Sequence, residues 1–194
     1  MSKNIAILAS GSGTNAENII RYFQQKDANV EVKWVLTNKQ DAYVVTRAKG
    51  LNVPCRFFPK EAWKDGKEIM KLLQDAHVDL IVLAGFLLRI PDCITEAFPQ
   101  RILNIHPALL PKFGGKGMYG MHVHEAVVAA GEKQTGISIH YINKEYDKGH
   151  MLFQAVCAVE PTDTPEDVAT KVHALEYEHY PQVIELALEI LEQQ

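Results

Sequence analysis

The sequence has 194 residues, of which 47% are hydrophobic and 23% charged, and its formal net charge is −4. This composition is that of an ordinary globular chain of about one domain, and it excludes disordered, collagen-like and disulfide-scaffold classes. The acidic balance gives no sign of a nucleic-acid or anionic-membrane surface. No apolar run approaches the roughly 18 residues that indicate a membrane span, and no secretory cleavage pattern follows Met1. We therefore expect a cytoplasmic protein with a single domain over residues 1–194.

The three cysteines, Cys55, Cys93 and Cys157, are odd in number and widely spaced, and none belongs to a C-x-x-C pair. A zinc ribbon or a thioredoxin-like centre is therefore not indicated. We interpret all of them as small, mostly buried residues in a reducing compartment.

The first part of the chain alternates short apolar segments with helical patterns. Strands are expected at 5–9, 30–36, 53–57, 80–84 and 101–105, and helices at about 16–25, 43–49, 61–76 and 91–98. Gly50 is expected to cap the C-terminus of the second of these helices. Such regular alternation predicts an α/β fold with one doubly wound, mainly parallel sheet.

The regular alternation of expected strands and helices ends in the last third of the sequence. Residues 135–142 alternate, residues 151–159 form another strand candidate, and only a short turn separates them. This pattern predicts an antiparallel C-terminal hairpin added to the parallel sheet. A final helix is expected to begin near Thr164, which is followed by a proline and two acidic residues that suit a first turn. A break or kink is expected in this helix at Pro181.

A glycine-rich turn, G-S-G-T-N-A at 11–16, follows the first expected strand. Such a turn exposes backbone N–H groups at a helix N-terminus, where the donors and the helix dipole together favour an anion. A dinucleotide site also needs an acidic residue about 20 positions further on, but that region reads L-T-N-K-Q. We therefore favour a single phosphate or phosphoribosyl group bound by Gly13, Thr14 and Asn15. NAD(P) binding and a plain turn capped by Ser12 or Thr14 are the alternatives.

The stretch L-N-I-H-P-A-L-L-P at 103–111 is the most informative part of the sequence. Side chains alternate along a strand, so Asn104 and His106 should point to the same face, and the following proline restricts the backbone of His106. An amide and an imidazole at the carboxyl end of a strand can stabilise a developing oxyanion and move a proton near neutral pH. The alternative is that both side chains only satisfy backbone groups of the loop.

Asp147 lies in the turn Y-D-K-G between the two hairpin strands. If its carboxylate faces His106, it would favour the imidazolium and raise the pKa of that ring. An aspartate in such a turn is also ordinary turn chemistry. No serine or cysteine is evidently coupled to these residues, so the nucleophile would have to come from the substrate.

Together these residues resemble the formyltransferases that use 10-formyltetrahydrofolate, and the similarity extends over nearly the whole chain. Its motifs are I-L-A-S-G-S-G-T-N at 7–15, L-A-G-F at 83–86, L-N-I-H-P-A-L-L-P at 103–111, T-G-I-S-I-H at 135–140 and Y-D-K-G at 146–149. The N-x-H-P-x-L-L-P stretch with a later D-x-G is highly specific for this family. The S-G-x-G-[ST]-N loop is typical of the branch that acts on phosphoribosylglycinamide, where it holds the 5′-phosphate of the substrate.

The resemblance implies transfer of the formyl group of 10-formyltetrahydrofolate, a co-substrate, to the amine of 5-phosphoribosylglycinamide in purine biosynthesis, without a metal. It implies that Asn104, His106 and Asp147 are catalytic. The implied substrate-binding residues are Gly13, Thr14, Asn15, Gly85 and Glu176. The implied folate-binding residues are Leu87, Leu88, Arg89, Ile90, Asn104, Asn143, Lys144, Glu145, Tyr146 and Asp147. For Glu176 the alternative is a solvated helix face.

Two features depart from the family pattern. Leu87 and Leu88 precede Arg89 where the family often has a single residue, so more than one side chain here could reach the folate. The loop at 112–121 is longer than expected, and its glycines and lysines suggest a mobile flap over the active site.

Other polar residues near these motifs have a less defined role. Lys64 or Lys67 is a candidate contact for the glutamate tail of the folate. His122 and His124 alternate as metal ligands can, but no third ligand lies at a recognisable spacing, so we favour local structure for both.

The nearest enzyme alternatives are relatives with the same catalytic trio that act on methionyl-tRNA, on an amino sugar or, as a hydrolase, on formyltetrahydrofolate itself. A non-catalytic nucleotide-binding module is the alternative from a different class. We expect small-molecule substrates, no nucleic-acid or membrane partner, and a monomer or a homodimer.

Overall fold

A computed structural model describes residues 2–26, 29–143 and 149–193. Its seven-stranded sheet has the strand order β3-β2-β1-β4-β5-β6-β7. The strands are β1 (Lys3–Leu8), β2 (Val30–Thr37), β3 (Cys55–Phe57), β4 (Leu80–Leu83), β5 (Ile102–His106), β6 (Gln134–Tyr141) and β7 (Met151–Ala158). The helices are α1 (Thr14–Gln25), α2 (Val44–Gly50), α3 (Ala62–Asp65), α4 (Lys67–Asp75), α5 (Asp92–Ala97), α6 (Met121–Ala129) and α7 (Pro165–Glu192).

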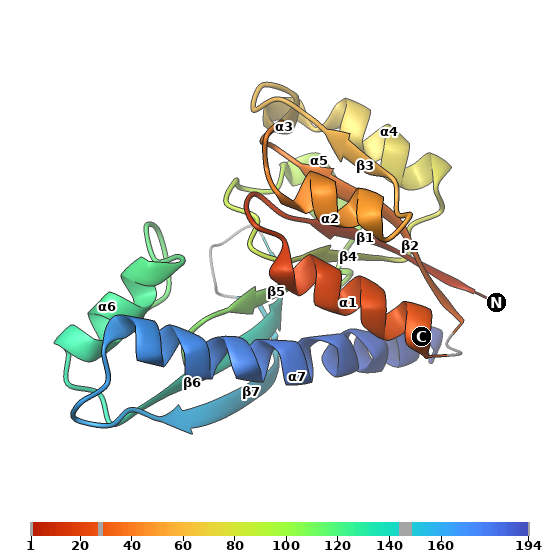
Figure 1. Ribbon diagram of the computed structural model, residues 1–194. Coiled ribbons are helices and arrows are strands. Elements are labelled where there is room, and N and C mark those ends of the chain that lie inside the picture. Colours follow the sequence, from red (N-terminus) through yellow and green to blue (C-terminus); the bar gives the residue numbers. More distant parts are fainter. Residues whose placement is uncertain (1, 27–28, 144–148, 194) are drawn as a thin grey trace.

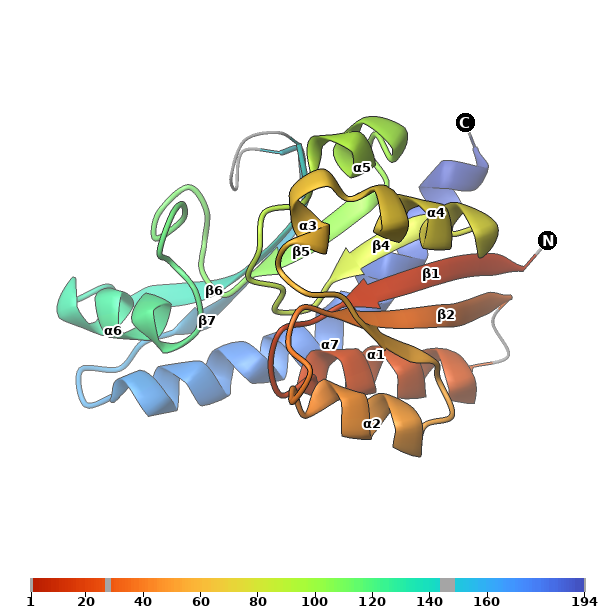
Figure 2. The ribbon, with the colours of Figure 1, turned by 90° about the horizontal axis from the view of Figure 1, so that it is seen from above.

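The pairing of the strands confirms the predicted fold class. Strands β1 to β5 pair in parallel, whereas β6 is antiparallel to both β5 and β7. Figure 1 shows α7 along one face of the sheet and α6 beyond the ends of β6 and β7. Helices α1, α2 and α7 cover one face, and α3, α4 and α5 cover the other (Figure 2).

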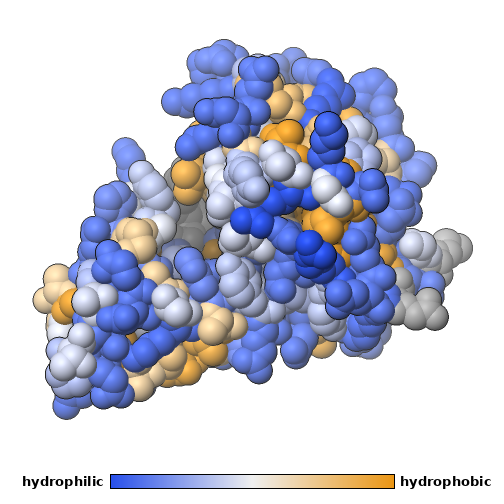
Figure 3. All heavy atoms as spheres, viewed as in Figure 1, coloured by the Kyte–Doolittle hydropathy of each residue, from blue (hydrophilic) through white to orange (hydrophobic). Residues whose placement is uncertain are grey.

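Strand β1 is buried on both faces, as its unbroken apolar run predicts. Ile5 and Ile7 belong to the core under α1 and α7, whereas Ala6 and Leu8 belong to the core under α4 and α5. The face of the molecule seen in Figure 3 is mostly polar, with hydrophobic side chains in places. Among the described residues, no helix has both the length and the apolar content that crossing a bilayer requires.

The single helix expected at 61–76 is wrong, because the structure divides it into α3 and α4. Gly66 between them has φ of +68°, a left-handed conformation that ends one helix and begins the next. A Cβ atom at this position would lie 2.8 Å from the Cβ atom of Pro91. Glycine is therefore required by both the backbone conformation and the close approach of the α5 segment.

Two further details of the helices differ from the prediction. Gly50 is the last residue of α2 rather than its left-handed cap, and Asn52 takes the positive φ instead, at 58°. Helix α6 was not predicted, because its buried face combines Val123 and Val127 with a histidine, His124, and so lacks a clear apolar stripe.

Helix α7 begins at Pro165 with Thr164 as its N-cap, as predicted, and Thr164 and Asp167 form a capping box. The expected break at Pro181 is absent, since the helix continues to Glu192. A proline cannot donate to the carbonyl four residues earlier, which here belongs to Tyr177. The side-chain Nδ2–H of Asn18 in α1 donates to that carbonyl instead, at 2.9 Å.

Candidate functional site

A cleft of about 740 Å³ lies beyond the carboxyl ends of β1, β4 and β5. Strands β1 and β4 are neighbours in the sheet, and the chain leaves them toward opposite edges. Ligands of open α/β sheets bind at such a switch point, because the diverging connections leave a crevice between them. The fold therefore gathers the glycine-rich turn and the segments after β4 and β5 around one space.

The glycine-rich turn leaves the first turn of α1 open toward this cleft. Gly13 is the N-cap of α1, with φ of 75° and no side-chain cap, so the alternative of a turn capped by Ser12 or Thr14 is wrong. The first helical hydrogen bond runs from Glu17 N–H to the Gly13 carbonyl at 2.9 Å. The amides of residues 14–16 therefore have no acceptor within the helix.

Helix α2 holds the turn in this conformation. A Cβ atom on Gly13 would lie 2.4 Å from Cγ2 of Val44, so only glycine allows this packing. Arg47 donates from Nε to the Ser12 carbonyl at 2.8 Å and forms an ion pair with Glu17. Side chains of α2 thus stabilise the backbone whose amides face the cleft.

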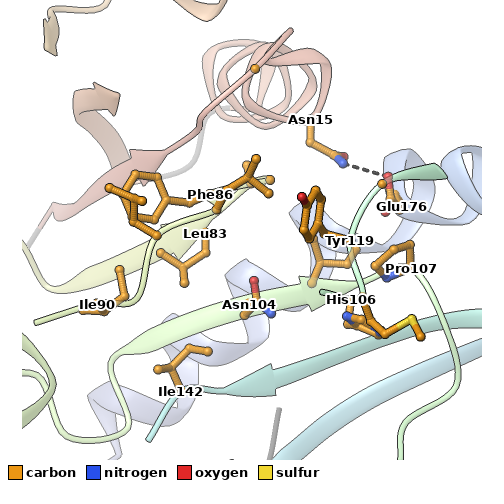
Figure 4. A pocket seen from close by; sticks show the side chains of 18 of the residues that line it. Asn15, Leu83, Phe86, Ile90, Asn104, His106, Pro107, Tyr119, Ile142 and Glu176 are labelled. Atoms are coloured by element: carbon orange, nitrogen blue, oxygen red, sulfur yellow. Dashed lines mark hydrogen bonds between the residues drawn. The ribbon is translucent and has the colours of Figure 1, made fainter. Parts of the chain in front are cut away.

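Glu176 of α7 is buried at the edge of the cleft, with 6% of its surface exposed. Asn15 Nδ2 donates to Glu176 Oε2 at 2.8 Å (Figure 4), so the alternative of a solvated helix face is wrong. Burial raises the pKa of Glu176, and the Asn15 hydrogen bond and nearby His173 oppose that shift. The Oδ1 atom of Asn15 is buried without a partner among the described residues.

Tyr180, one turn after Glu176, was not singled out by the sequence analysis. Its buried hydroxyl lies 2.9 Å from the carbonyl of Leu83 and 3.1 Å from that of Leu103. It thereby links α7 to the carboxyl end of β4 and to the neighbouring strand β5. A tyrosine four residues from a predicted binding residue on the same helix face is the signal that could have identified it.

Asn104 and His106 line the same cleft from β5, which confirms that they share one face of the strand (Figure 4). His106 is buried, with 4% of its surface exposed. Its Nε2–H donates to the carbonyl oxygen of Phe113 at 2.8 Å, a contact of the kind that the loop alternative anticipated. The predicted Asp147 and Lys144, Glu145 and Tyr146 lie outside the described residues.

The predicted folate residues after β4 also line the cleft, and these are Leu87, Leu88, Arg89 and Ile90, together with Asn143. The segment is held by Ser10, a residue that sequence reasoning missed. Ser10 N–H donates to the Gly85 carbonyl at 3.1 Å, and Leu87 N–H donates to Ser10 Oγ at 2.9 Å. The guanidinium of Arg89 forms an ion pair with Asp92 at 2.6 Å.

A smaller groove of about 430 Å³ adjoins the cleft at the segment after β4. It is lined by Lys60, Trp63, Lys64, Asp65, Leu88, Arg89, Ile90, Pro91, Asp92 and Cys93. Of the two lysines considered for the folate tail, Lys64 lines this groove and Lys67 does not.

The loop after Pro111 covers one side of the cleft, where the sequence predicts a flap. Residues 115–120 line the cleft, and three of their glycines, Gly115, Gly117 and Gly120, have positive φ. Met118 N–H donates to the Gly115 carbonyl at 3.1 Å and closes a tight turn. The mobility of this loop stays a prediction.

His122 and His124 lie at the start of α6 in different surroundings. His122 Nδ1 is exposed and lies 3.4 Å from Glu125. His124 is buried, and burial, followed by the charges of His173 and His106, lowers its pKa to about 4. In the described part of the chain, no three histidines, cysteines or acids are placed to hold a metal ion.

Comparisons with known proteins agree with this geometry. The family model described as formyl transferase matches residues 3–184. The chain is 41% identical to the chloroplastic phosphoribosylglycinamide formyltransferase of Arabidopsis thaliana, over 94% of this chain and 64% of that protein. It is 37% identical to the phosphoribosylglycinamide formyltransferase of Haemophilus influenzae, over 94% of this chain and 85% of that protein.

Solved structures give the same result. The phosphoribosylglycinamide formyltransferase from Bacillus halodurans has a TM-score of 0.87 and 35% identity, covering 96% of this chain and 95% of its own. The enzyme of that name from Anaplasma phagocytophilum has a TM-score of 0.88 and 30% identity, covering 97% and 88%. The chain spans only 64% and 61% of the length of two plant relatives. From the family match and these likenesses together, the chain belongs to the formyl transferase family.

Proposed function

We propose that this protein transfers the formyl group of 10-formyltetrahydrofolate to the amine of 5-phosphoribosylglycinamide. One observation carries the proposal: an open helix N-terminus and the Asn104–His106 pair face the same cleft. A substrate with a phosphate at one end and a reacting amine at the other would span these two features. The relatives named above carry the name of this activity.

The phosphate would lie on the backbone amides of Thr14, Asn15 and the following residue. These amides have no helical acceptor, and the positive end of the α1 dipole favours an anion there. Gly13 supports this role because only glycine allows the positive φ and the packing against Val44 that hold the turn in this conformation.

The ribose or glycinamide part of the substrate would lie against Glu176 and Asn15. Glu176 uses one carboxylate oxygen for Asn15 Nδ2, and the other would accept from a hydroxyl or an amide of the substrate. The buried Oδ1 of Asn15 lacks a partner among the described residues. A substrate donor that reached this oxygen would remove the cost of an unsatisfied acceptor.

The reaction forms a bond from the substrate nitrogen to the formyl carbon and breaks the bond from that carbon to N10 of the folate. Negative charge develops on the formyl oxygen, where Asn104 Nδ2–H and a protonated His106 would donate to it. The amine loses a proton and N10 gains one, and His106, or a water held by Asp147, would carry it. Holding both substrates in one cleft would contribute several kcal/mol through orientation alone.

The folate would occupy the part of the cleft between Asn143 and the segment from Leu87 to Ile90. Backbone amides and carbonyls of that segment could pair with a flat heterocycle, and its leucines supply apolar contact. The carboxylates of the folate tail would extend into the adjoining groove toward Lys64. Because Arg89 is already paired with Asp92, Lys64 is the better candidate for this contact.

The test is to mix the protein with glycinamide ribonucleotide and 10-formyltetrahydrofolate, or its dideaza analogue, and to follow the absorbance change of the folate. Turnover that requires the ribonucleotide is the expected result. Equal turnover without it would indicate a hydrolase, and no turnover with saturating substrates would contradict the proposal.

Four accompanying inferences stay predictions. The protein is proposed to work as a single domain, as a monomer or a homodimer, without a nucleic-acid partner. Its three cysteines are free thiols, which fits a reducing compartment such as the cytoplasm.

A further inference from the structure

His140 lies behind the cleft and directly opposite Asn104 in the antiparallel ladder of β5 and β6. Directly opposed side chains of such a ladder share one face of the sheet and come into contact. His140 is 0% exposed, and it is not among the described residues that line the cleft. A buried imidazole therefore touches the predicted catalytic amide from the side that no substrate reaches.

On its other edge, toward β7, the pairing of β6 is irregular next to His140. The register of β6 against β7 shifts between Ile139 and His140, so Ile139 opposes Phe153 while His140 opposes Met151. Such bulges re-aim a side chain and are common beside functional sites.

The hydrogen bonds of His140 define its tautomer. Its Nδ1 lies 3.2 Å from the carbonyl oxygen of Tyr141, which can only accept, so Nδ1 carries the proton. In the neutral ring Nε2 is then an acceptor. Asn104 Nδ2, at 3.2 Å from Nε2, is the donor to it.

We propose that His140 is a positioning residue that fixes which end of the Asn104 carboxamide donates. This inference rests on the proposed function. An amide can turn by half a rotation and exchange its oxygen and nitrogen at little steric cost. With the proton on Nδ1 of His140, the turned amide would place its oxygen against a lone pair of Nε2, which opposes the exchange.

The fixed orientation has a direct consequence for the reaction. Nδ2 has two hydrogens, and His140 takes one. The second hydrogen remains on Nδ2 for a ligand, and Asn104 lines the cleft from β5 (Figure 4). Without the acceptor, the amide would spend part of its time with an oxygen facing the developing oxyanion. Misplacement of a single catalytic group by about 1 Å can cost on the order of 100-fold in rate.

The kinetic test compares His140→Leu, Asn104→Ala and the double variant with the wild-type protein. We expect His140→Leu to lower kcat about 10- to 100-fold with little change in the KM for the ribonucleotide. In the Asn104→Ala background the same change should lower kcat less than about twofold, because the group it positions is gone. His140→Gln, whose oxygen can accept from Asn104, should retain more activity than His140→Leu. Independent, multiplicative losses would overturn the proposal.

Ile139→Val is the matched control for packing. It truncates a fully buried neighbour in the same strand and should cost about 1 kcal/mol of stability while leaving kcat unchanged. A drop in kcat equal to that of His140→Leu would show that any defect in β6 lowers activity, and would overturn the positioning role.

A second measurement does not depend on activity. Nitrogen-15 NMR of the imidazole should show His140 protonated at Nδ1 and not at Nε2, and the Asn104 side-chain amide protons should exchange slowly. In His140→Leu the exchange of these protons should accelerate at least tenfold. A proton on Nε2 of His140 would overturn the proposal even in an active enzyme. If wild type transfers no formyl group, the proposed function fails, and the NMR result still decides whether His140 fixes the amide.

Discussion

His106 is held by the loop that covers the cleft, because its Nε2 proton is donated to the carbonyl of Phe113. The ring is therefore preorganised before a substrate arrives. Replacing it with alanine removes a donor to the formyl oxygen and the proton carrier together, while the phosphate site in α1 stays intact. We expect His106→Ala to lower kcat about 100- to 1000-fold with a much smaller change in the Kd for the ribonucleotide.

For His106→Ala, stopped-flow absorbance would measure kcat and calorimetry would measure the Kd for the ribonucleotide. His122→Ala is the matched control. His122 lies just after the loop that covers the cleft, its side chain is exposed, and its Nδ1 lies 3.4 Å from Glu125. Near-normal turnover in His106→Ala would remove the catalytic assignment.

Protonation of His124 makes the folding stability of the protein depend on pH. Its folded-state pKa is lowered to about 4 from an ordinary value of 6.5, so the unfolded chain binds this proton first as the pH falls. Stability from this group is complete above about pH 6.5 and is lost progressively down to about pH 4. At pH 5 the loss amounts to about 2 kcal/mol.

Urea unfolding at pH 7 and pH 5 would measure that loss. In His124→Gln the difference between the two pH values should shrink by most of this amount, whereas His122→Gln should leave it unchanged. An unaltered difference in His124→Gln would mean that other groups control the acid response.

At the scale of the element, helix α7 contains a proline, and the neighbouring helix α1 supplies the hydrogen-bond donor that this proline lacks. Asn18 of α1 donates to the Tyr177 carbonyl that Pro181 leaves without a helical donor. We expect Asn18→Ala to destabilise the protein by about 1 kcal/mol, the usual net value of such a hydrogen bond.

A double-mutant cycle with Pro181→Ala isolates the effect. Alanine at 181 restores an N–H to the Tyr177 carbonyl, so Asn18→Ala should cost clearly less in that background. Equal costs in both backgrounds, measured by urea unfolding, would show that Asn18 acts through other contacts.

The local signals in the sequence predict most elements but not their interruptions. The apolar run of β1 and the capping residues around Thr164 depend on neighbours in sequence, and both were found where expected. The division at Gly66 and the continuity at Pro181 depend on contacts with Pro91 and Asn18, which are distant in sequence. Such tertiary contacts override local preference and cannot be inferred from spacing.

At the scale of the whole molecule, the site also combines features that depend on neighbours in sequence with features that depend on distant contacts. That Asn104 and His106 share a face follows from strand periodicity. The bond between Asn15 and Glu176 joins positions 161 residues apart, and only the resemblance to a family suggested that Glu176 belonged to the site. Ser10 and His140 lie within the motifs at 7–15 and 135–140, but the support that they and Tyr180 give depends on contacts between distant segments, which a local pattern does not show.

The proposed ribonucleotide site draws on α1, β5 and α7, which lie at the two ends of the chain and in its middle. A ligand that contacts all of them binds only the folded state, and so it should stabilise the whole molecule by mass action. Glycinamide ribonucleotide at 100 times its Kd should raise the free energy of unfolding by about 2.7 kcal/mol.

Asn15→Ala should lose most of this stabilisation, because it removes the partner of Glu176 and an acceptor for the ligand. Asn18→Ala, one turn further along α1 and outside the cleft lining, is the matched control and should keep it. Thermal unfolding with and without the ribonucleotide would measure both. A ligand-induced increase in Tm that is the same in Asn15→Ala as in wild type would place the ribonucleotide elsewhere on the molecule, and the substrate would then have to be sought through the Asn104–His106 end of the cleft alone.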